Sequence, residues 1–266
     1  MEKSINKELV AEMVHLHVVI VGTTTDEIER EKAIRRLEEI IIVTRFSKLE
    51  EQKLLRVFGE DLYPYYDKYF FEPTVAVEKK FLQQTIENKK VDLRNIQKRT
   101  LLYFKFPALV KEEILAAGIS KDDTVAFIGS GPFPLTAILY NRYSGAKVHC
   151  IEKEESSCVE SRKLLKKLGL ENEITVIHTQ GEKIRNQNYS LISMASQAYP
   201  KDAILEHLLN VLAPKTKVLF RVQCGAAVIF YNGETNISSS ILNKFALIKR
   251  MPRADYTMMS LLYEVK

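Results

Sequence analysis

Cysteine is scarce in this chain, and no long apolar run interrupts it. Its three cysteines, Cys150, Cys158 and Cys224, are spaced too widely to suggest a disulfide framework or a tetrahedral metal site, so we expect them to pack in the interior. The apolar run from Val14 to Val21 is too short to cross a bilayer. The N-terminus lacks the basic start and the small-residue cleavage site of a signal peptide. These absences predict a cytoplasmic protein that does not engage a membrane.

A block of like charge is also missing. The 266 residues carry 39 Lys and Arg against 34 Asp and Glu, and the charges alternate along the chain, so a nucleic-acid partner is not indicated. The length suits one large domain or two modest ones. The histidines show no spacing that points into a single site, and we therefore expect no protein-bound metal. They are His15, His17, His149, His178 and His207.

The residues before Gly118 carry helix signals almost throughout. Thr24 with Glu27 and Ser47 with Glu50 have the spacing of a capping box, in which each side chain satisfies a backbone N–H of the other residue. Both pairs therefore predict helix starts.

Prolines and a glycine mark the later helices of this half. Pro73 and Pro107 suit the first residues of two helices, and Gly118 suits the position just past the end of the second one. We expect residues 1–118 to form a helical domain.

After Gly118 the pattern changes to short apolar strands that alternate with amphipathic helices. This alternation is typical of a doubly wound parallel sheet with an α/β fold, which we expect to occupy residues 119–266. The last two strands have little between them, so they should form an antiparallel pair, as in the class I fold that binds S-adenosylmethionine (SAM). The strand segments are 124–129, 147–152, 173–178, 189–196, 216–222, 245–251 and 257–265.

The first strand runs into the turn GSGPFP, where an open parallel sheet binds its ligand. Gly129 and Gly131 let the backbone approach a ligand closely, and Pro132 stiffens the entry to the next helix. The second strand ends in Glu152, whose carboxylate can accept both ribose hydroxyls of a nucleoside. The turn lacks the third glycine that admits a pyrophosphate beside the helix. An adenosyl ligand without phosphates therefore fits best; the alternative is a plain turn and a solvated acid.

Three segments carry a family resemblance. IGSGPFPLTAILY, HCIEKE and FRVQCGAAVIFY resemble the nicotianamine synthase family, including its staphylopine synthase branch. The resemblance implies a helical N-terminal domain attached to a Rossmann-like SAM-binding domain. It also implies transfer of the 3-amino-3-carboxypropyl group of SAM to an amine acceptor, with methylthioadenosine as the leaving product and a nicotianamine-like metallophore as the outcome.

The attacking amine must lose a proton, so the site needs a base. The resemblance points to Glu78 as this base and to Tyr103 as the residue that orients it or the amine. A solvated charge beside Lys79 and Lys80 is an equally good interpretation of Glu78. The reserve candidates for the base are Glu72, Glu112 and Glu113.

Further site residues follow from the fold. Gly181 and Glu182 stand where the adenine edge is read, and Met194 and Ala195 should pack against adenine and the thioether. Arg221 could grip a carboxylate of the substrate or of SAM, or it could form a structural salt bridge. The full set expected to bind SAM is Gly129, Ser130, Gly131, Pro132, Phe133, Pro134, Thr136, Glu152, Gly181, Glu182, Met194 and Ala195.

Two other classes of function remain open, together with a less favoured relationship to spermidine synthases. One is a SAM-dependent methyltransferase, although the fourth strand ends in SMASQAYPK and lacks the motif of many base and amide methylating enzymes. The other is a SAM-binding regulator without catalysis. Within the favoured class we expect a single transfer onto an amino acid such as histidine, in preference to self-condensation of SAM. A homodimer is a further expectation.

Overall fold

The computed structural model describes residues 7–58, 62–66, 68–69, 82–83, 87, 106–185, 188–230, 237–252 and 258–266. Its contacts divide the chain into two compact units, which we describe separately. The first unit comprises Met1–Val77, Gln223–Gly233 and Pro252–Met259, and the second comprises Glu78–Val222, Glu234–Met251 and Ser260–Lys266.

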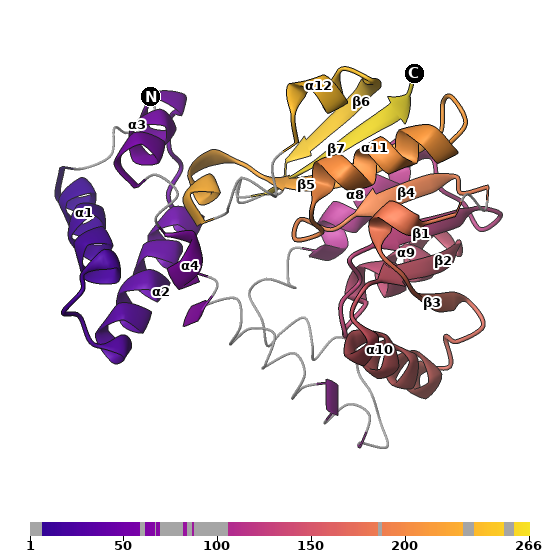
Figure 1. The fold of residues 1–266 in the computed structure, drawn as a ribbon, viewed down its shortest axis with the longest axis horizontal. Coiled ribbons are helices and arrows are strands. Elements are labelled where there is room, and N and C mark those ends of the chain that lie inside the picture. Colours follow the sequence, from indigo (N-terminus) through magenta and orange to yellow (C-terminus); the bar gives the residue numbers. More distant parts are fainter. Residues whose placement is uncertain are drawn as a thin grey trace. The chain divides into compact units, whose positions relative to one another are not determined.

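The first unit is helical and has a core of its own. Apolar residues at helical spacing in the second helix, Ile34, Leu37 and Ile41, are at most 2% exposed and form the centre of this core. Met13 from the first helix and Phe58 from the third pack against them. The elements are α1 (Lys7–Val21), α2 (Glu27–Val43), α3 (Lys48–Phe58), α4 (Tyr63–Tyr66) and the 3₁₀ helix η3 (Gly225–Phe230) (Figure 1).

One of the two predicted capping boxes is confirmed. The backbone N–H of Ser47 donates to Oε2 of Glu50 at 2.7 Å, and the backbone N–H of Glu50 donates to Oγ of Ser47 at 3.4 Å. The other prediction is wrong, because Asp26 caps α2 by accepting from the backbone N–H of Glu29 at 2.9 Å. Asp26 lies directly before the helix, and its carboxylate is a strong N-cap acceptor.

The η3 segment belongs to the helical unit although it follows a strand of the sheet. Its residues Ala226, Ala227, Ile229 and Phe230 are buried in the helical core. The Phe230 ring stacks on Tyr66 with a centroid separation of 4.6 Å. The FRVQCGAAVIFY segment therefore ends a strand and then completes the core of the other unit.

The second unit contains a seven-stranded sheet in the order β3-β2-β1-β4-β5-β7-β6. The first five strands are parallel, and their nearly continuous apolar sequences match burial on both faces. β6 and β7 point in opposite directions (Figure 1), which confirms the predicted antiparallel ending. The strands are β1 (Thr124–Ile128), β2 (Lys147–Glu152), β3 (Ile174–His178), β4 (Leu191–Met194), β5 (Lys217–Gln223), β6 (Phe245–Pro252) and β7 (Met258–Val265).

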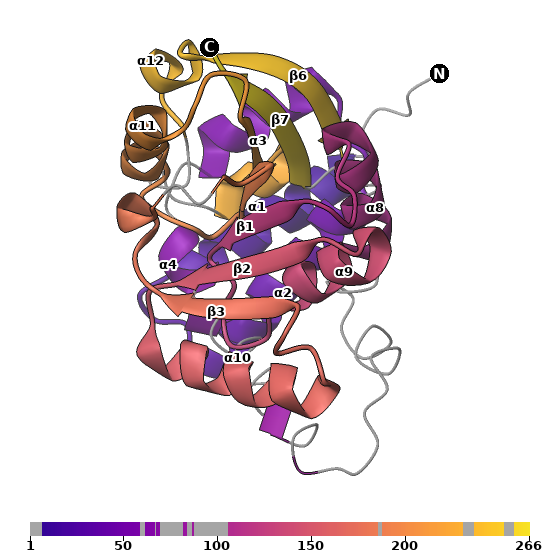
Figure 2. The same ribbon diagram turned by 90° about the vertical axis from the view of Figure 1, so that its right-hand side faces the viewer.

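Helices cover both faces of this sheet, and the alternation of side chains along β1 shows how. On one face, Val125 and Phe127 belong to the buried cluster that includes residues of α8, α9 and α10. On the other face, Ile128 and Ile204 of α11 both pack closely around Gly181. In Figure 2, β1, β2 and β3 lie side by side and α10 runs along β3. The covering elements are α8 (Phe106–Ala117), α9 (Leu135–Ser144), α10 (Glu155–Leu168), η2 (Gly181–Lys183), α11 (Lys201–Val211) and α12 (Ser239–Leu242).

Helix α8 precedes Gly118 in the chain, within the range expected for the helical domain, but it packs with the sheet unit. Its residues Val110, Ile114 and Ala117 are buried in the cluster of the sheet unit. Gly118 ends α8 with a φ of 65°, and the backbone N–H of Ile119 donates to Ile114 O, as expected of a glycine C-cap. Gly118 thus ends a helix as predicted, but this helix is part of the sheet unit.

Two of the three cysteines lie in the interior of the sheet unit. Cys150 and Cys158 are fully buried in the cluster of the sheet unit, and burial raises the pKa of the Cys150 thiol to about 12. This placement confirms packing as the role of Cys150 and Cys158, whereas Cys224 is only half-buried. None of the helices described is long and apolar enough to cross a membrane.

Candidate functional site

The carboxyl ends of β2, β1 and β4 lie next to one another, and the loops that follow them contain most of the predicted ligand-binding residues. Ile128, the last residue of β1, is in register with Ile151 of β2 and Met194 of β4. Open parallel sheets bind ligands beyond this edge. The three loops therefore form the candidate site.

Both glycines of the β1 loop adopt a conformation that other residues avoid. The φ angles of Gly129 and Gly131 are 79° and 65°. A Cβ added to Gly129 would lie 3.1 Å from Cβ of Ala198 and 3.3 Å from Cβ of Ala195, so this glycine also permits close approach of the β4 loop. A Cβ at Gly131 would meet nothing within 4 Å, which leaves open space at the point where the loop turns.

Glu152 is held in place by the backbone on both of its carboxylate oxygens. The backbone N–H of Gly131 donates to Oε2 at 2.8 Å, and the backbone N–H of Glu154 donates to Oε1 at 2.9 Å. The residue is 7% exposed. Because each carboxylate oxygen has capacity for a second hydrogen bond, the group remains able to accept ligand hydroxyls. The structure thus brings Gly131 and Glu152 into direct contact.

The proline-containing part of the loop is buried and anchored. Pro132, Phe133 and Pro134 are buried, and the Phe133 side chain belongs to the core cluster. The Ser161 hydroxyl of α10 lies 2.9 Å from Gly131 O and 3.2 Å from Pro132 O, so it ties the loop to the helix. Ser161 was not among the predicted site residues, because nothing local in α10 indicates that its hydroxyl reaches a loop some thirty residues earlier.

Arg221 is engaged by side chains of the protein itself. Its Nε and Nη2 donate to the two carboxylate oxygens of Glu113, each at 2.9 Å, and its Nη1 donates to Thr136 Oγ1 at 3.0 Å. Arg221 is 2% exposed, and Glu113 is fully buried. The structure therefore shows the salt-bridge alternative for Arg221: the carboxylate that it grips belongs to Glu113. The reserve base Glu113 and the predicted SAM residue Thr136 are occupied by the same network.

Three hydroxyls complete the network around Glu113. The Tyr140 hydroxyl donates its proton to Oε2 of Glu113 at 2.8 Å and lies 3.3 Å from Ser193 Oγ, and the hydroxyl of Ser260 donates to Oε1 of Glu113. Burial and the Glu113 carboxylate raise the pKa of Tyr140 well above its usual range, so Tyr140 stays a neutral donor. The network thus joins α8, α9, β4, β5 and β7 within the sheet unit.

The residues after β3 and β4 line the sheet edge in different ways. A Cβ on Gly181 would lie 3.0 Å from Cγ2 of Ile128 and 3.1 Å from Cδ1 of Ile204, so Gly181 permits tight packing of η2 against α11 and β1. Met194 is fully buried, whereas Ala195 and Glu182 are half-buried. Of these predicted residues, Ala195 and Glu182 keep the surface that contact with a ligand requires.

The predicted catalytic residues Glu78 and Tyr103, and the reserve candidate Glu72, lie outside the described residues. The remaining reserve candidate, Glu112, is half-exposed and forms an ion pair with Lys249 at 3.6 Å.

A buried lysine stands at the end of the β4 loop. Lys201, the first residue of α11, is fully buried, and its Nζ donates to Ser196 O and, at 2.8 Å, to Ala198 O. Burial lowers the pKa of this amine to about 8. Lys201 was not among the predicted site residues, since a lysine at the start of a helix is usually exposed.

Tyr199 in the same loop is paired with the β2 loop. Lys153 Nζ lies 4.3 Å from the centroid of the Tyr199 ring. Because β1 lies between β2 and β4 in the sheet, this cation–π pair links the two loops on either side of β1.

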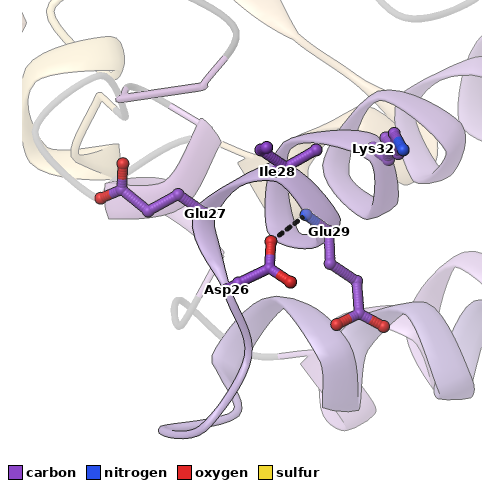
Figure 3. Close-up of a pocket in the computed structure, with 5 residues that line it drawn as sticks. All are labelled: Asp26, Glu27, Ile28, Glu29 and Lys32. Carbon is purple, nitrogen blue, oxygen red and sulfur yellow. Dashed lines mark hydrogen bonds between the residues drawn. The ribbon is translucent and has the colours of Figure 1, made fainter.

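A shallow hollow occurs in the helical unit, at the first turn of α2. It is lined by Asp26, Glu27, Ile28, Glu29 and Lys32 (Figure 3). Figure 3 shows that the Asp26 carboxylate is turned toward the backbone N–H of Glu29, the cap described above. The backbone N–H of Glu29 is already satisfied by Asp26, and the Glu27 carboxylate is paired with Lys68 at 2.7 Å, so the hollow offers little for a ligand and we assign no site here. In the part of the chain that the structure describes, no cluster of His, Cys, Asp and Glu suitable for a metal was found.

Comparison with known proteins identifies the family. The model of the family "Nicotianamine synthase protein" matches residues 102–262, more than half of the chain. The chain belongs to the nicotianamine synthase family. The family match spans the glycine loop, Glu152 and the β5–η3 segment, which carried the resemblance in the sequence.

Individual proteins add detail. The chain is 29% identical to the L-histidine 2-aminobutanoyltransferase of Yersinia pestis over 136 residues, a match that spans 50% of this chain and 51% of that relative. A relative with the same name in Pseudomonas aeruginosa is 29% identical over 124 residues. The match thus covers about half the length of these curated relatives.

Among solved structures, the fold resembles a glutamate-to-glutamine variant of MtNAS in complex with S-adenosylmethionine. The TM-score is 0.82 at 19% identity, covering 98% of this chain and 99% of MtNAS. This likeness extends to the whole chain and confirms the predicted fold class.

Proposed function

We propose that the protein is a transferase that moves the 3-amino-3-carboxypropyl group of SAM to an amine acceptor and releases methylthioadenosine. The contact between Gly131 and Glu152 carries the proposal, because it places a glycine turn and a strand-end acid together at the sheet edge, as a nucleoside site would need, in a chain that belongs to the nicotianamine synthase family. The metal-chelating character of nicotianamine-like products makes a metallophore the expected outcome.

In this reaction the lone pair of the acceptor amine forms a bond to the γ-carbon of the methionine moiety. The bond between that carbon and the sulfonium sulfur breaks, its electrons stay on sulfur, and neutral methylthioadenosine leaves. The amine proton passes to a base. Since all three carbons on the sulfonium are electrophilic, the enzyme selects one of them by orientation alone.

The residues of the described site fit an adenosyl ligand. Glu152 would accept the ribose hydroxyls, because its carboxylate is already oriented by two backbone N–H groups and keeps acceptor capacity. The open space beside Gly131 would admit the ligand to the loop. Glu182 and Ala195 would lie along adenine. The Ser161 anchor would hold the Gly131–Pro132 backbone rigid around the donor.

For the chemical step we propose Glu78 as the base and Tyr103 as the residue that orients it, as the family resemblance implies. Glu113 is a poor base, because both of its oxygens are taken by Arg221 and by hydroxyls and it is fully buried. Glu112 and Glu72 remain the reserve candidates.

For the acceptor we propose an amino acid, with histidine first. The support is the name of the relatives in Yersinia pestis and Pseudomonas aeruginosa, which describes transfer to L-histidine. We also propose that the protein works in the cytoplasm, where SAM is made, and we retain the homodimer as a prediction.

A product assay tests this proposal. The purified protein is incubated with SAM and each amino acid in turn, and mass spectrometry follows the products. We expect an acceptor that carries one aminobutyrate group, formed most rapidly with histidine. Nicotianamine formed from SAM without an added acceptor would overturn the choice of acceptor, and a methylated acceptor would overturn the reaction class.

A further inference from the structure

The loop between β4 and α11 is built around a buried amine. Lys201 is fully buried, and its Nζ bonds two carbonyl oxygens of the loop, those of Ser196 and Ala198. A further bond from Ala198 N to Ala195 O, at 3.2 Å, closes the loop on itself. The amine therefore occupies the inside of the turn and fixes the direction of its carbonyls.

This loop forms one side of the glycine turn. The Cβ atoms of Ala195 and Ala198 lie within 3.3 Å of the position that a Cβ on Gly129 would take, so the two loops are in contact. The backbone N–H of Ala195 also donates to Ile128 O at 3.0 Å. A change in the shape of the β4 loop is therefore transmitted directly to the β1 loop, where the proposed donor binds.

The burial of the Lys201 amine has an unfavourable free energy. Burial of an amine disfavours its charged form, in agreement with the lowered pKa of Lys201. Among the described residues no carboxylate is within ion-pair distance of it. An apolar side chain of similar length would fill the same space without this cost, but it could not hold the two carbonyls.

We propose that Lys201 is a positioning residue for the SAM pocket: by holding the carbonyls of Ser196 and Ala198, it fixes the β4 loop against Gly129 and thereby sets the width of the adenosyl site. The inference rests on the proposed function only for the identity of the ligand. The contacts between the loops stand without it.

A matched pair of lysine variants provides the test. Lys201→Met removes the two bonds to the β4 loop. Lys217→Met is the control: Lys217 begins β5 at the opposite end of the strands, and its Nζ donates to a backbone carbonyl, Ala117 O, at 2.7 Å. Calorimetry measures the affinity for methylthioadenosine, thermal unfolding measures stability, and amide hydrogen exchange reports the order of residues 195–199.

We expect Lys201→Met to bind methylthioadenosine at least tenfold more weakly and to exchange faster at residues 195–199, and Lys217→Met to bind within twofold of wild type. Wild-type affinity in Lys201→Met, or an equal loss in both variants, would overturn the proposal.

Should Lys201→Met fail to fold, Lys201→Gln, which keeps a donor, must show a smaller loss of affinity for methylthioadenosine. If the wild type itself fails to bind methylthioadenosine, the proposed function is contradicted, whereas unchanged exchange at residues 195–199 in the variant contradicts the role of Lys201.

Discussion

Glu152 is the residue on which recognition of the ligand should depend most. In Glu152→Gln the amide must place its NH₂ group opposite the backbone N–H of either Gly131 or Glu154, so one of these contacts becomes a donor facing a donor. Hydrogen bonds to a charged group contribute about 1.5–3 kcal/mol each. We therefore predict that calorimetry will show roughly ten- to hundredfold weaker binding of methylthioadenosine. Glu155→Gln, a change at an exposed position in the first turn of α10, is the control and should bind normally. Unchanged binding by Glu152→Gln would remove Glu152 from the site.

A change at Glu78 should lower turnover and leave the affinity for SAM unchanged, whereas the change at Glu152 should lower affinity. If it accepts the proton of the amine, Glu78→Gln should lower turnover on the order of 10²- to 10⁴-fold while leaving SAM affinity close to that of wild type. A rate assay combined with calorimetry separates the two quantities. Glu155→Gln, at an exposed position in the first turn of α10, serves as the control. Wild-type turnover in Glu78→Gln would move the role of base to another acid.

The residues found from sequence were those with a local signal. Gly129, Gly131 and Glu152 stand at the ends of recognisable strands, where the topology of the sheet fixes their meeting place. The partner of Arg221 had no such signal, because Glu113 lies 108 positions earlier in the chain. Ser161 and Lys201 act on backbone carbonyls, which every residue possesses, so no sequence pattern announces the contact.

At the scale of elements, the buried ion pair between α8 and β5 should matter more to stability than any exposed pair. Removal of one partner, as in Arg221→Met, leaves the Glu113 carboxylate buried without compensation, which typically costs about 3–5 kcal/mol. Replacement of both, as in the double variant Arg221→Met and Glu113→Leu, should recover much of that loss. Arg35→Ala is the control, because the Arg35–Glu31 pair is roughly half-exposed and should contribute under about 1 kcal/mol. Urea unfolding measures all three. A double variant whose free energy of unfolding is lower than that of Arg221→Met would contradict this account.

Element boundaries were predictable where a cap is written into the sequence. The Ser47–Glu50 box and the glycine after α8 both appeared in the structure as expected. The start of α2 was misassigned by two residues, because Thr24 and Asp26 both suit the N-cap position and only one of them can occupy it. Local patterns thus located the helices well and their first residues less well.

At the scale of the whole molecule, the order of elements was easier to predict than their grouping. The alternation of strands and helices and the antiparallel pair at the end are visible in the sequence, whereas the order of the strands within the sheet became known only from the structure. The grouping depends on long-range packing: α8 joins the sheet unit through Val110 and Ile114, and η3 joins the helical unit through Ile229 and Phe230. Neither helix carries a mark in its own residues that shows which core it will enter.

The by-product of the reaction tests the central claim most directly. Aminocarboxypropyl transfer leaves methylthioadenosine, whereas methyl transfer from the same donor leaves S-adenosylhomocysteine, so the by-product identifies the carbon that was attacked. The measurement is chromatography of SAM incubated with the enzyme and a panel of amino acids, with SAM alone as the control because SAM also decays slowly to methylthioadenosine. We predict enzyme-dependent methylthioadenosine in amounts equal to the aminobutyrate transferred. Enzyme-dependent S-adenosylhomocysteine in its place would contradict the account and indicate a methyltransferase.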